Sequence, residues 1–267
     1  MTQTLRKPCI VGNWKMHGSS QMVAGWVREL LNSPDEFNNI QVVICPPNIY
    51  LEQVGAVFRH HRVPNFALGA QNVYCESAGA FTGEVSPQML LDVGCQYVIV
   101  GHSERRALFC EDDALIARKF RAAYHAGLIP ILCVGETQAE REQGKTFEVI
   151  RHQLETVFNE VEIKSSFRAY IAYEPVWAIG TGLTATPEEA EAVQAHIRRW
   201  LSERGEKVAQ ELSLLYGGSV KAANVKGLLT MPSVDGVLVG GASVVAKEFL
   251  DICHNSSLVR TSWNKSS

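Results

Sequence analysis

The clearest unit of local structure in the chain is residues 169–187, which read AYIAYEPVWAIGTGLTATP. The apolar run 169–173 is typical of a buried strand, and Pro175 cannot continue a strand ladder. A loop of small residues follows, and residues 186–189 (TPEE) form a capping box with proline at the first helical position. The stretch therefore predicts a strand, a loop and a helix in that order, with Glu174 at the carboxyl end of the strand.

The same alternation of strand and helix patterns runs through the whole chain. Eight short apolar runs are mostly continuous rather than alternating, which is typical of parallel strands that are buried on both faces. Helical patterns separate them, without a linker or a low-complexity segment. We therefore predict a single α/β domain, a closed (β/α)8 barrel, over residues 1–254. Its predicted strands are Cys9–Val11, Ile40–Cys45, Phe66–Ala70, Tyr97–Val100, Ile129–Val134, Ala169–Tyr173, Leu212–Tyr216 and Gly236–Val239.

Three further features of the sequence concern the fold. An open, doubly wound sheet is the alternative, but it usually carries a glycine-rich dinucleotide fingerprint, and residues 12–15 (GNWK) after the first strand are not one. The first helix is expected to have Ser20 as its N-cap and to stop at Pro34. Residues 255–267 are polar, and we predict that they form a mobile C-terminal tail.

The composition limits the kind of protein and its partners. The chain has 267 residues and a net charge of −3, and its lysines and arginines are scattered, so we expect no nucleic-acid partner. The N-terminus lacks the apolar core of a signal peptide, and no apolar run is long enough to span a membrane. The seven cysteines are odd in number and show no C-x-x-C spacing. These features predict reduced thiols and a cytoplasmic protein without a membrane partner.

Polar side chains directly follow several predicted strands, at the end of a barrel where active sites are built. Asn13 and Lys15 follow the first strand, His102 the fourth and Glu174 the sixth. A buried carboxylate is costly unless it has a role, and Glu174 beside a loop able to close suggests proton transfer kept away from water. Each of these residues also has a structural interpretation. Lys15 and Glu104, for example, are expected to form an ion pair.

The sequence around His102 favours a neutral imidazole. His102 ends an apolar run and precedes residues 103–106 (SERR), which look like the start of a helix. The N–H groups of such a helix would point at one ring nitrogen and disfavour the charged ring. A neutral imidazole can donate a hydrogen bond to a carbonyl and exchange protons with an enediolate. A purely structural histidine is the alternative.

Glycine-rich turns follow the last three predicted strands. Residues 180–182 lie in the loop after the sixth strand, residues 217–219 follow the seventh and residues 240–241 follow the eighth. These turns are either simple tight turns or a phosphate site built from backbone N–H groups, and two such turns before helix starts favour the phosphate site. The sequence has no HExxH motif, P-loop or nucleophile elbow, and no lysine ends the sixth strand. We therefore predict no metal and no cofactor.

Five motifs at these positions together resemble the triosephosphate isomerase family, and the resemblance covers residues 5–254. It implies a TIM barrel and an isomerase of glycolysis and gluconeogenesis. That enzyme would interconvert dihydroxyacetone phosphate and D-glyceraldehyde 3-phosphate through an enediol(ate), without a cofactor. His17 and Val134 depart from the usual family residues, and the chain extends past the usual family end. The motifs are residues 12–16 (GNWKM), 100–106 (VGHSERR), 172–182 (AYEPVWAIGTG), 216–220 (YGGSV) and 235–243 (DGVLVGGAS).

The resemblance also implies a role for each site residue. Glu174 would be the base that moves a proton between two carbons, and His102 would polarise the carbonyl and shuttle the hydroxyl proton. Lys15 would stabilise negative charge and, together with Asn13, bind the substrate. Residues 175–183 would form a lid over the site. The phosphate would be held by the backbone N–H groups of Gly180, Ser219, Gly240 and Gly241.

A homodimer is implied as well. Residues 71–84 match the loop that reaches into the partner subunit of such dimers, where Thr82 would approach the region around the partner's Asn13. A tetramer is an alternative to the dimer.

The residues alone also leave two alternative functions. One is another phosphate-binding barrel enzyme that acts on a larger sugar or indole phosphate, and the other is an added surface-binding role that involves residues 255–267.

Overall fold

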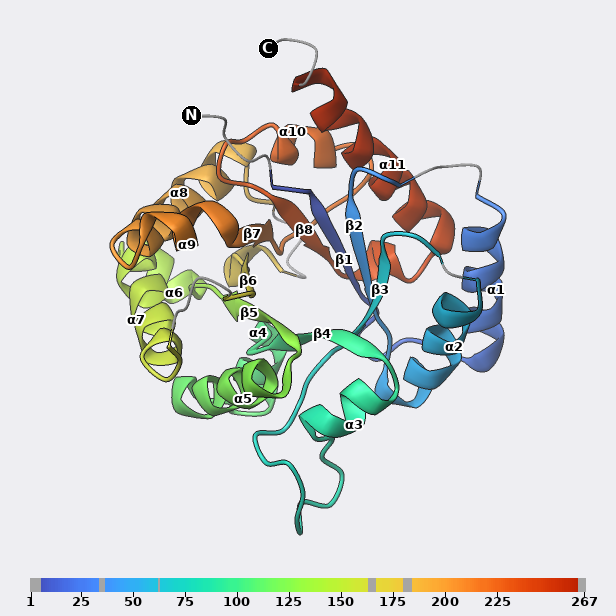
Figure 1. The fold of residues 1–267 in the computed structure, drawn as a ribbon. Helices are drawn as coiled ribbons and strands as arrows, with labels where there is room; N and C mark the ends of the chain where they lie inside the picture. Colours follow the sequence, from blue (N-terminus) through green and yellow to red (C-terminus); the bar gives the residue numbers. More distant parts are fainter. Residues whose placement is uncertain (1–5, 34–36, 62, 163–166, 180–183, 264–267) are drawn as a thin grey trace.

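The chain folds into a closed barrel of eight parallel strands with helices around it, as the computed structural model in Figure 1 shows. The structure describes residues 6–33, 37–61, 63–162, 167–179 and 184–263, the last four of them by their backbone alone. Each strand pairs in parallel with the next, and β1 pairs with β8, which closes the barrel and confirms the predicted fold. The strands are β1 (Cys9–Asn13), β2 (Gln41–Cys45), β3 (Phe66–Ala70), β4 (Cys95–Val100), β5 (Ile129–Val134), β6 (Tyr170–Tyr173), β7 (Ser213–Tyr216) and β8 (Gly236–Val239).

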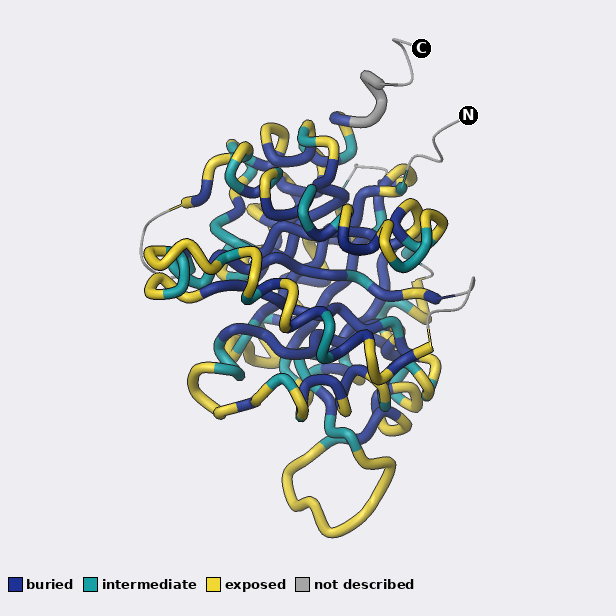
Figure 2. Tube along the Cα trace, turned by 90° about the vertical axis from the view of Figure 1, so that its left-hand side faces the viewer, coloured by how far each residue is buried: buried dark blue, intermediate teal, exposed yellow. Residues whose placement is uncertain are grey.

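The strands separate two layers of apolar core. Successive strand residues point to opposite faces, so Val11 and Val43 fill the barrel interior while Ile10 and Ile44 pack under the helices. The strands are buried along almost their whole length, as Figure 2 shows. Each buried Val, Leu or Ile side chain stabilises the fold by roughly 1.5–3 kcal/mol. Burial on both faces is the physical reason why the strand sequences are continuously apolar.

Helices cover the outer face of the barrel and connect consecutive strands. None of the described helices is both long enough and apolar enough to cross a membrane. The α-helices are α1 (Ser20–Leu31), α2 (Leu51–His61), α3 (Pro87–Asp92), α4 (Ser103–Leu108), α5 (Asp113–Ala126), α6 (Gln138–Glu142), α7 (Thr146–Phe158), α8 (Pro187–Ser202), α9 (Glu206–Glu211), α10 (Val225–Leu229) and α11 (Ala246–Trp263). The described residues also form the short 3₁₀ helices η1 (Asn48–Tyr50), η2 (Val176–Ala178) and η3 (Gly241–Ser243).

The start of α1 corrects one predicted helix cap. Ser19, and not Ser20, is the N-cap, because its backbone is extended and its Oγ accepts a hydrogen bond from the Met22 N–H at 3.0 Å. Two consecutive serines offer the same cap chemistry, so the backbone geometry decides between them. The predicted capping box at Thr186 is confirmed at the start of α8. Pro34, the predicted end of the first helix, lies outside the described residues.

The last helix corrects the predicted C-terminal tail. α11 runs from Ala246 to Trp263, so the boundary expected after residue 254 falls inside a helix. Ser256 is completely buried, and its Oγ donates to the Ile252 carbonyl oxygen at 2.7 Å. Because the helix itself satisfies this hydroxyl, a serine-rich sequence continues the helix instead of ending it. Residues 264–267 lie outside the described part of the chain.

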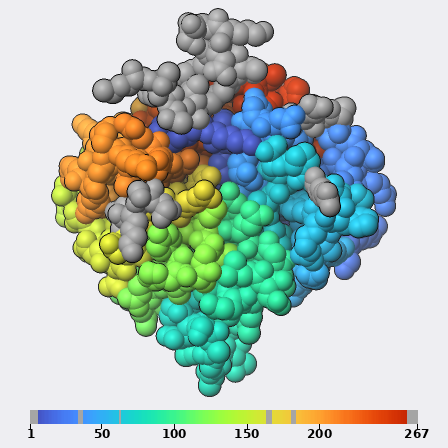
Figure 3. Space-filling model, in the orientation of Figure 1, coloured from blue at the N-terminus to red at the C-terminus, as the bar shows by residue number. Residues whose placement is uncertain are grey.

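One loop projects from the body of the barrel. Residues 71–86 connect β3 to α3, and their tip extends away from the other elements in Figure 1 and is exposed in Figure 2. The space-filling view in Figure 3 shows this loop as a knob at the lower edge of the molecule. The rings of Tyr74 and Phe81 pack together within it, with their centroids 4.8 Å apart. A projecting surface loop of this kind is a common site of contact with another molecule.

Candidate active site

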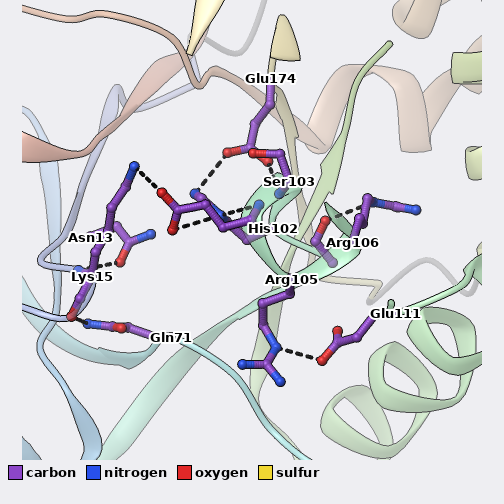
Figure 4. A network of polar contacts seen from close by, with 11 residues as sticks. Asn13, Lys15, Gln71, His102, Ser103, Arg105, Arg106, Glu111 and Glu174 are labelled. Atoms are coloured by element: carbon purple, nitrogen blue, oxygen red, sulfur yellow. Dashed lines mark hydrogen bonds and ion pairs between the residues drawn. The ribbon is translucent and has the colours of Figure 1, made fainter. Parts of the chain in front are cut away.

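The carboxyl ends of β4 and β6 bring His102 and Glu174 into contact, as Figure 4 shows. His102 Nε2 lies 3.0 Å from Glu174 Oε1, and the Ser103 backbone N–H donates to Glu174 Oε2 at 2.8 Å. Only 5% of His102 and 2% of Glu174 is exposed. The Ser103 N–H donates to one carboxylate oxygen and the imidazole lies against the other, and both contacts offset the cost of burying the negative charge.

The hydrogen bonds of His102 select one neutral form of its ring. His102 is the N-cap of α4, and its Nδ1 accepts a hydrogen bond from the Glu104 backbone N–H at 3.2 Å. A ring nitrogen that accepts a hydrogen bond carries no hydrogen, so the neutral ring holds its hydrogen on Nε2. This is the geometry that the sequence predicts, and it directs an N–H donor toward Glu174.

Lys15 enters the same site from the loop after β1. Its backbone lies in the left-handed region, with φ at 53°, which is uncommon outside glycine. Two contacts hold it there: the Lys15 N–H donates to Asn13 Oδ1 at 3.0 Å, and Gln71 Nε2 donates to the Lys15 carbonyl oxygen at 2.8 Å. Lys15 Nζ lies 2.6 Å from Glu104 Oε1, which confirms the expected ion pair. The strained backbone therefore fixes where the cation stands.

The main chain and side chain of Glu174 are packed closely against two glycines. A Cβ at Gly135 would lie 1.8 Å from the Glu174 carbonyl oxygen, and a Cβ at Gly217 would lie 2.9 Å from Glu174 Cγ. Cys133 is completely buried beside Glu174. Burial, together with the nearby Glu174 charge, raises the pKa of the Cys133 thiol well above its usual range. The thiol therefore stays protonated and does not compete with Glu174 as a base.

A cavity of about 650 Å³ opens beside Glu174, and most of the predicted site residues line it. Gly240 approaches Lys15, since a Cβ at Gly240 would lie 3.2 Å from Lys15 Cε. Gly180, the remaining predicted phosphate ligand, lies outside the described residues. The cavity is thus lined by a cation, an imidazole, a carboxylate and glycine-rich turns together. Its lining includes Asn13, Lys15, His102, Glu174, Gly217, Gly218, Ser219, Gly240 and Gly241.

A buried carboxylate that the sequence analysis did not assign holds the start of the predicted lid. Glu136 is completely buried, and its Oε1 accepts hydrogen bonds from Tyr173 Oη at 3.1 Å and Trp177 Nε1 at 2.9 Å. Burial and the Glu136 charge hold the pKa of Tyr173 far above its usual range, so its hydroxyl remains a donor. The Arg141 guanidinium stacks 4.1 Å from the Trp177 ring centroid. No sequence motif indicates this cluster, because it depends on packing of the loop after β5 against β6 and η2.

A second hollow lies on the other side of Lys15. It has a volume of about 370 Å³ and is lined by residues from the loops after β1, β2, β3 and β4. Large apolar side chains stand exposed at its edge, with Met16 95% exposed and Phe109 62% exposed. Asn13, Lys15 and His102 line this hollow as well as the larger cavity. The candidate active site therefore adjoins a hollow with exposed apolar side chains at its edge.

Comparisons with known proteins agree with this geometry. The sequence model of the family described as triosephosphate isomerase matches residues 8–256. The chain is 52% identical to the triosephosphate isomerase of Thiobacillus denitrificans over 249 residues, which are 93% of this chain and 98% of that protein. It is 49% identical to that of Dechloromonas aromatica over 249 residues and 46% identical to that of Psychromonas ingrahamii over 248 residues, with the same two shares. The chain therefore belongs to the triosephosphate isomerase family.

Proposed function

We propose that the chain interconverts dihydroxyacetone phosphate and D-glyceraldehyde 3-phosphate by proton transfer through an enediolate. The observation that carries this proposal is the 3.0 Å contact between a buried carboxylate, Glu174, and a buried imidazole, His102, in a cavity that Lys15 also lines. This set provides a base, a hydrogen-bond donor and a cation in one place. Membership of the triosephosphate isomerase family supports the same substrates.

In the proposed reaction, Glu174 removes a proton from the hydroxyl-bearing carbon of dihydroxyacetone phosphate. His102 Nε2–H donates to the carbonyl oxygen, so negative charge can develop there as the enediolate forms. His102 then passes a proton between the two oxygens, and Glu174 returns its proton to the neighbouring carbon. The aldehyde product holds every atom of the ketone. Lys15 stabilises the developing charge from the β1 side of the cavity.

We assign phosphate binding to the turns after β7 and β8. Ser219, Gly240 and Gly241 line the cavity with Glu174, and bare backbone N–H groups at such turns suit a phosphate. Gly180 is included as a phosphate ligand only because of the motif in which it lies. Closure of residues 175–183 over the bound substrate would keep water from the intermediate.

The same proposal includes a homodimer. In this dimer the projecting loop 71–84 of one subunit would enter the partner's hollow of about 370 Å³ beside Lys15, and exposed Met16 and Phe109 would lose their contact with water. Since the hollow shares Asn13 and Lys15 with the cavity, a partner loop seated there would brace the candidate site. We also keep a cytoplasmic location in the proposal, because the seven cysteines are reduced and five of them are buried.

A coupled assay tests this function. Purified chain is given D-glyceraldehyde 3-phosphate or dihydroxyacetone phosphate, and the other triose phosphate is measured as it forms. We expect turnover in both directions, and no turnover of a hexose phosphate or an indole phosphate under the same conditions. Turnover of one of the larger phosphates without turnover of triose phosphates would assign the site to another phosphate-binding barrel enzyme.

A further inference from the structure

The turn after β5 lies directly against the proposed base. The last ladder contact between β5 and the following strand region is the Glu174 N–H, which donates to the Val134 carbonyl oxygen at 2.8 Å. At the next residue, Gly135, the backbone leaves the ladder. A Cβ placed on Gly135 would lie 1.8 Å from the Glu174 carbonyl oxygen and 2.8 Å from its carbonyl carbon. The Gly135 backbone is therefore in close contact with the main chain of Glu174.

A single side chain from the outer ring of helices satisfies this turn. Gln153 lies on α7 with 8% of its surface exposed. Its Oε1 accepts a hydrogen bond from the Gly135 N–H at 2.9 Å, and its Nε2 donates to the Gly135 carbonyl oxygen at 3.2 Å. The amide thus provides both hydrogen bonds that a neighbouring strand would otherwise provide. Without it, two buried backbone groups would lose their partners.

The same turn also reaches the start of the proposed lid. Glu136, the residue after Gly135, accepts a hydrogen bond from Trp177 Nε1 at 2.9 Å. Gln153 therefore fixes a two-residue turn that contacts the main chain of Glu174 on one side and Trp177 on the other. Gln153 itself does not line the cavity of about 650 Å³. Its effect on the reaction must pass through the backbone.

We infer that Gln153 is a positioning residue, which holds the Gly135 turn so that the Glu174 carboxylate is presented at the correct place for proton transfer. This inference rests on the proposed role of Glu174 as the base. A displacement of about 1 Å at a reacting group can lower a rate by about a hundredfold. The candidate phosphate ligands stand on the turns after β7 and β8, so substrate affinity should depend little on Gln153.

The test compares Gln153→Met with a matched control in the same ring of helices. Gln194, on α8, is also completely buried, but its amide atoms have no hydrogen-bond partner among the described residues. Gln194→Met therefore makes the same change of side chain without removing a hydrogen bond between described residues. We expect Gln153→Met to lower kcat by about tenfold to a hundredfold with KM nearly unchanged, and Gln194→Met to keep the wild-type kcat.

A third variant removes only one of the two hydrogen bonds of Gln153. It also tests the inference if Gln153→Met does not fold. Gln153→Glu retains an acceptor for the Gly135 N–H and loses the donor to its carbonyl, so we expect a kcat between those of wild type and Gln153→Met. Wild-type kcat in the folded Gln153 variants would overturn the inference, and so would a loss that appears only in KM. Thermal unfolding of all three variants checks that the active fractions are folded.

Failure of this inference is distinguishable from failure of the proposed function. If Glu174→Gln is inactive while the Gln153 variants retain the wild-type kcat, Glu174 is the base and only the positioning role is wrong. If Glu174→Gln turns over triose phosphates normally, the proposed role of Glu174 is wrong, and the positioning role is overturned with it.

Discussion

His102 Nε2 lies 3.0 Å from Glu174 Oε1, so the two groups that a substrate must engage are in contact with each other in this structure. The carbonyl oxygen of a bound triose phosphate would have to take the place of Glu174 beside His102 Nε2. The carboxylate would then lose its contact with the imidazole and turn toward carbon, while the Ser103 N–H still donates to it. Substrate binding would therefore replace the contact between the two side chains with a contact between each of them and the substrate.

The first prediction concerns the imidazole. We expect His102→Gln to fold and to lose about 10²–10⁴ in kcat, because an amide can donate to Glu174 but cannot pass a proton between two oxygens. KM should change little, since the candidate phosphate ligands lie on other turns. His125→Gln, an exposed position on α5, is the control and should retain the wild-type rate. A His102→Gln rate close to that of wild type would remove His102 from the mechanism.

The second prediction concerns the cation. Lys15→Met should lower kcat by about 10²–10³ and raise KM, because the charge faces both the developing oxyanion and the phosphate in the proposed reaction. Steady-state kinetics at one ionic strength measures both effects. Lys207→Met removes a lysine that forms an exposed ion pair with Glu211, and its kinetics should match those of wild type. If the two variants have equal kinetics, the role of Lys15 is limited to its ion pair with Glu104.

The third prediction concerns assembly. Met16 is 95% exposed in the single chain, so Met16→Arg should be harmless to a monomer. In the proposed dimer the same change places a charge in a closed apolar contact, and we expect sedimentation to show a monomer with reduced activity. Leu31→Arg, at the end of α1, should leave the assembly intact. Identical sedimentation of wild type and Met16→Arg would contradict the proposed interface.

The fourth prediction concerns alkaline pH. Burial raises the pKa of Cys9 from 9.0 to about 12, and it raises the pKa of Cys95 to a similar value. Between about pH 9 and pH 12, the thiols lose their protons in the unfolded chain but keep them in the folded chain. The free energy of unfolding therefore falls as pH rises above about 9. At about pH 10.5, Cys9 alone should account for about 2 kcal/mol of this loss.

Urea unfolding at neutral pH and at about pH 10.5 measures this effect. The Cys9→Val variant should lose less stability than wild type over the same pH interval, because it has no thiol to ionise at this position. The explanation fails if the free energy of unfolding does not change with pH, or if wild type and Cys9→Val lose stability equally.

The sequence predicts the barrel and the main candidate residues for the same physical reason. In a closed parallel barrel the carboxyl ends of all strands meet at one mouth, so residues that directly follow different strands are neighbours. Lys15, His102 and Glu174 meet in this way after β1, β4 and β6, although they are far apart in the chain. Even the Lys15–Glu104 ion pair is predictable, because both residues follow strand ends.

Other features depend on packing that strand order does not specify. Gln153 lies within an ordinary amphipathic helix, and only the three-dimensional structure shows that its amide faces the Gly135 turn. Glu136 and Trp177 meet through their side chains and share no motif. The helical residues after 254 were predicted as a tail because their sequence is polar. Ser256 occupies a buried position of α11 there, with its hydroxyl bonded back into the helix.

The turnover number of Glu174→Gln at saturating D-glyceraldehyde 3-phosphate tests the central claim most directly. Glutamine has nearly the same size and can still accept the Ser103 N–H, but its amide cannot take a proton from carbon. We predict a kcat lower than that of wild type by about 10²–10⁴, with KM close to the wild-type value and an unchanged unfolding midpoint. A Glu174→Gln enzyme with the wild-type turnover number would contradict the role of Glu174 as the base.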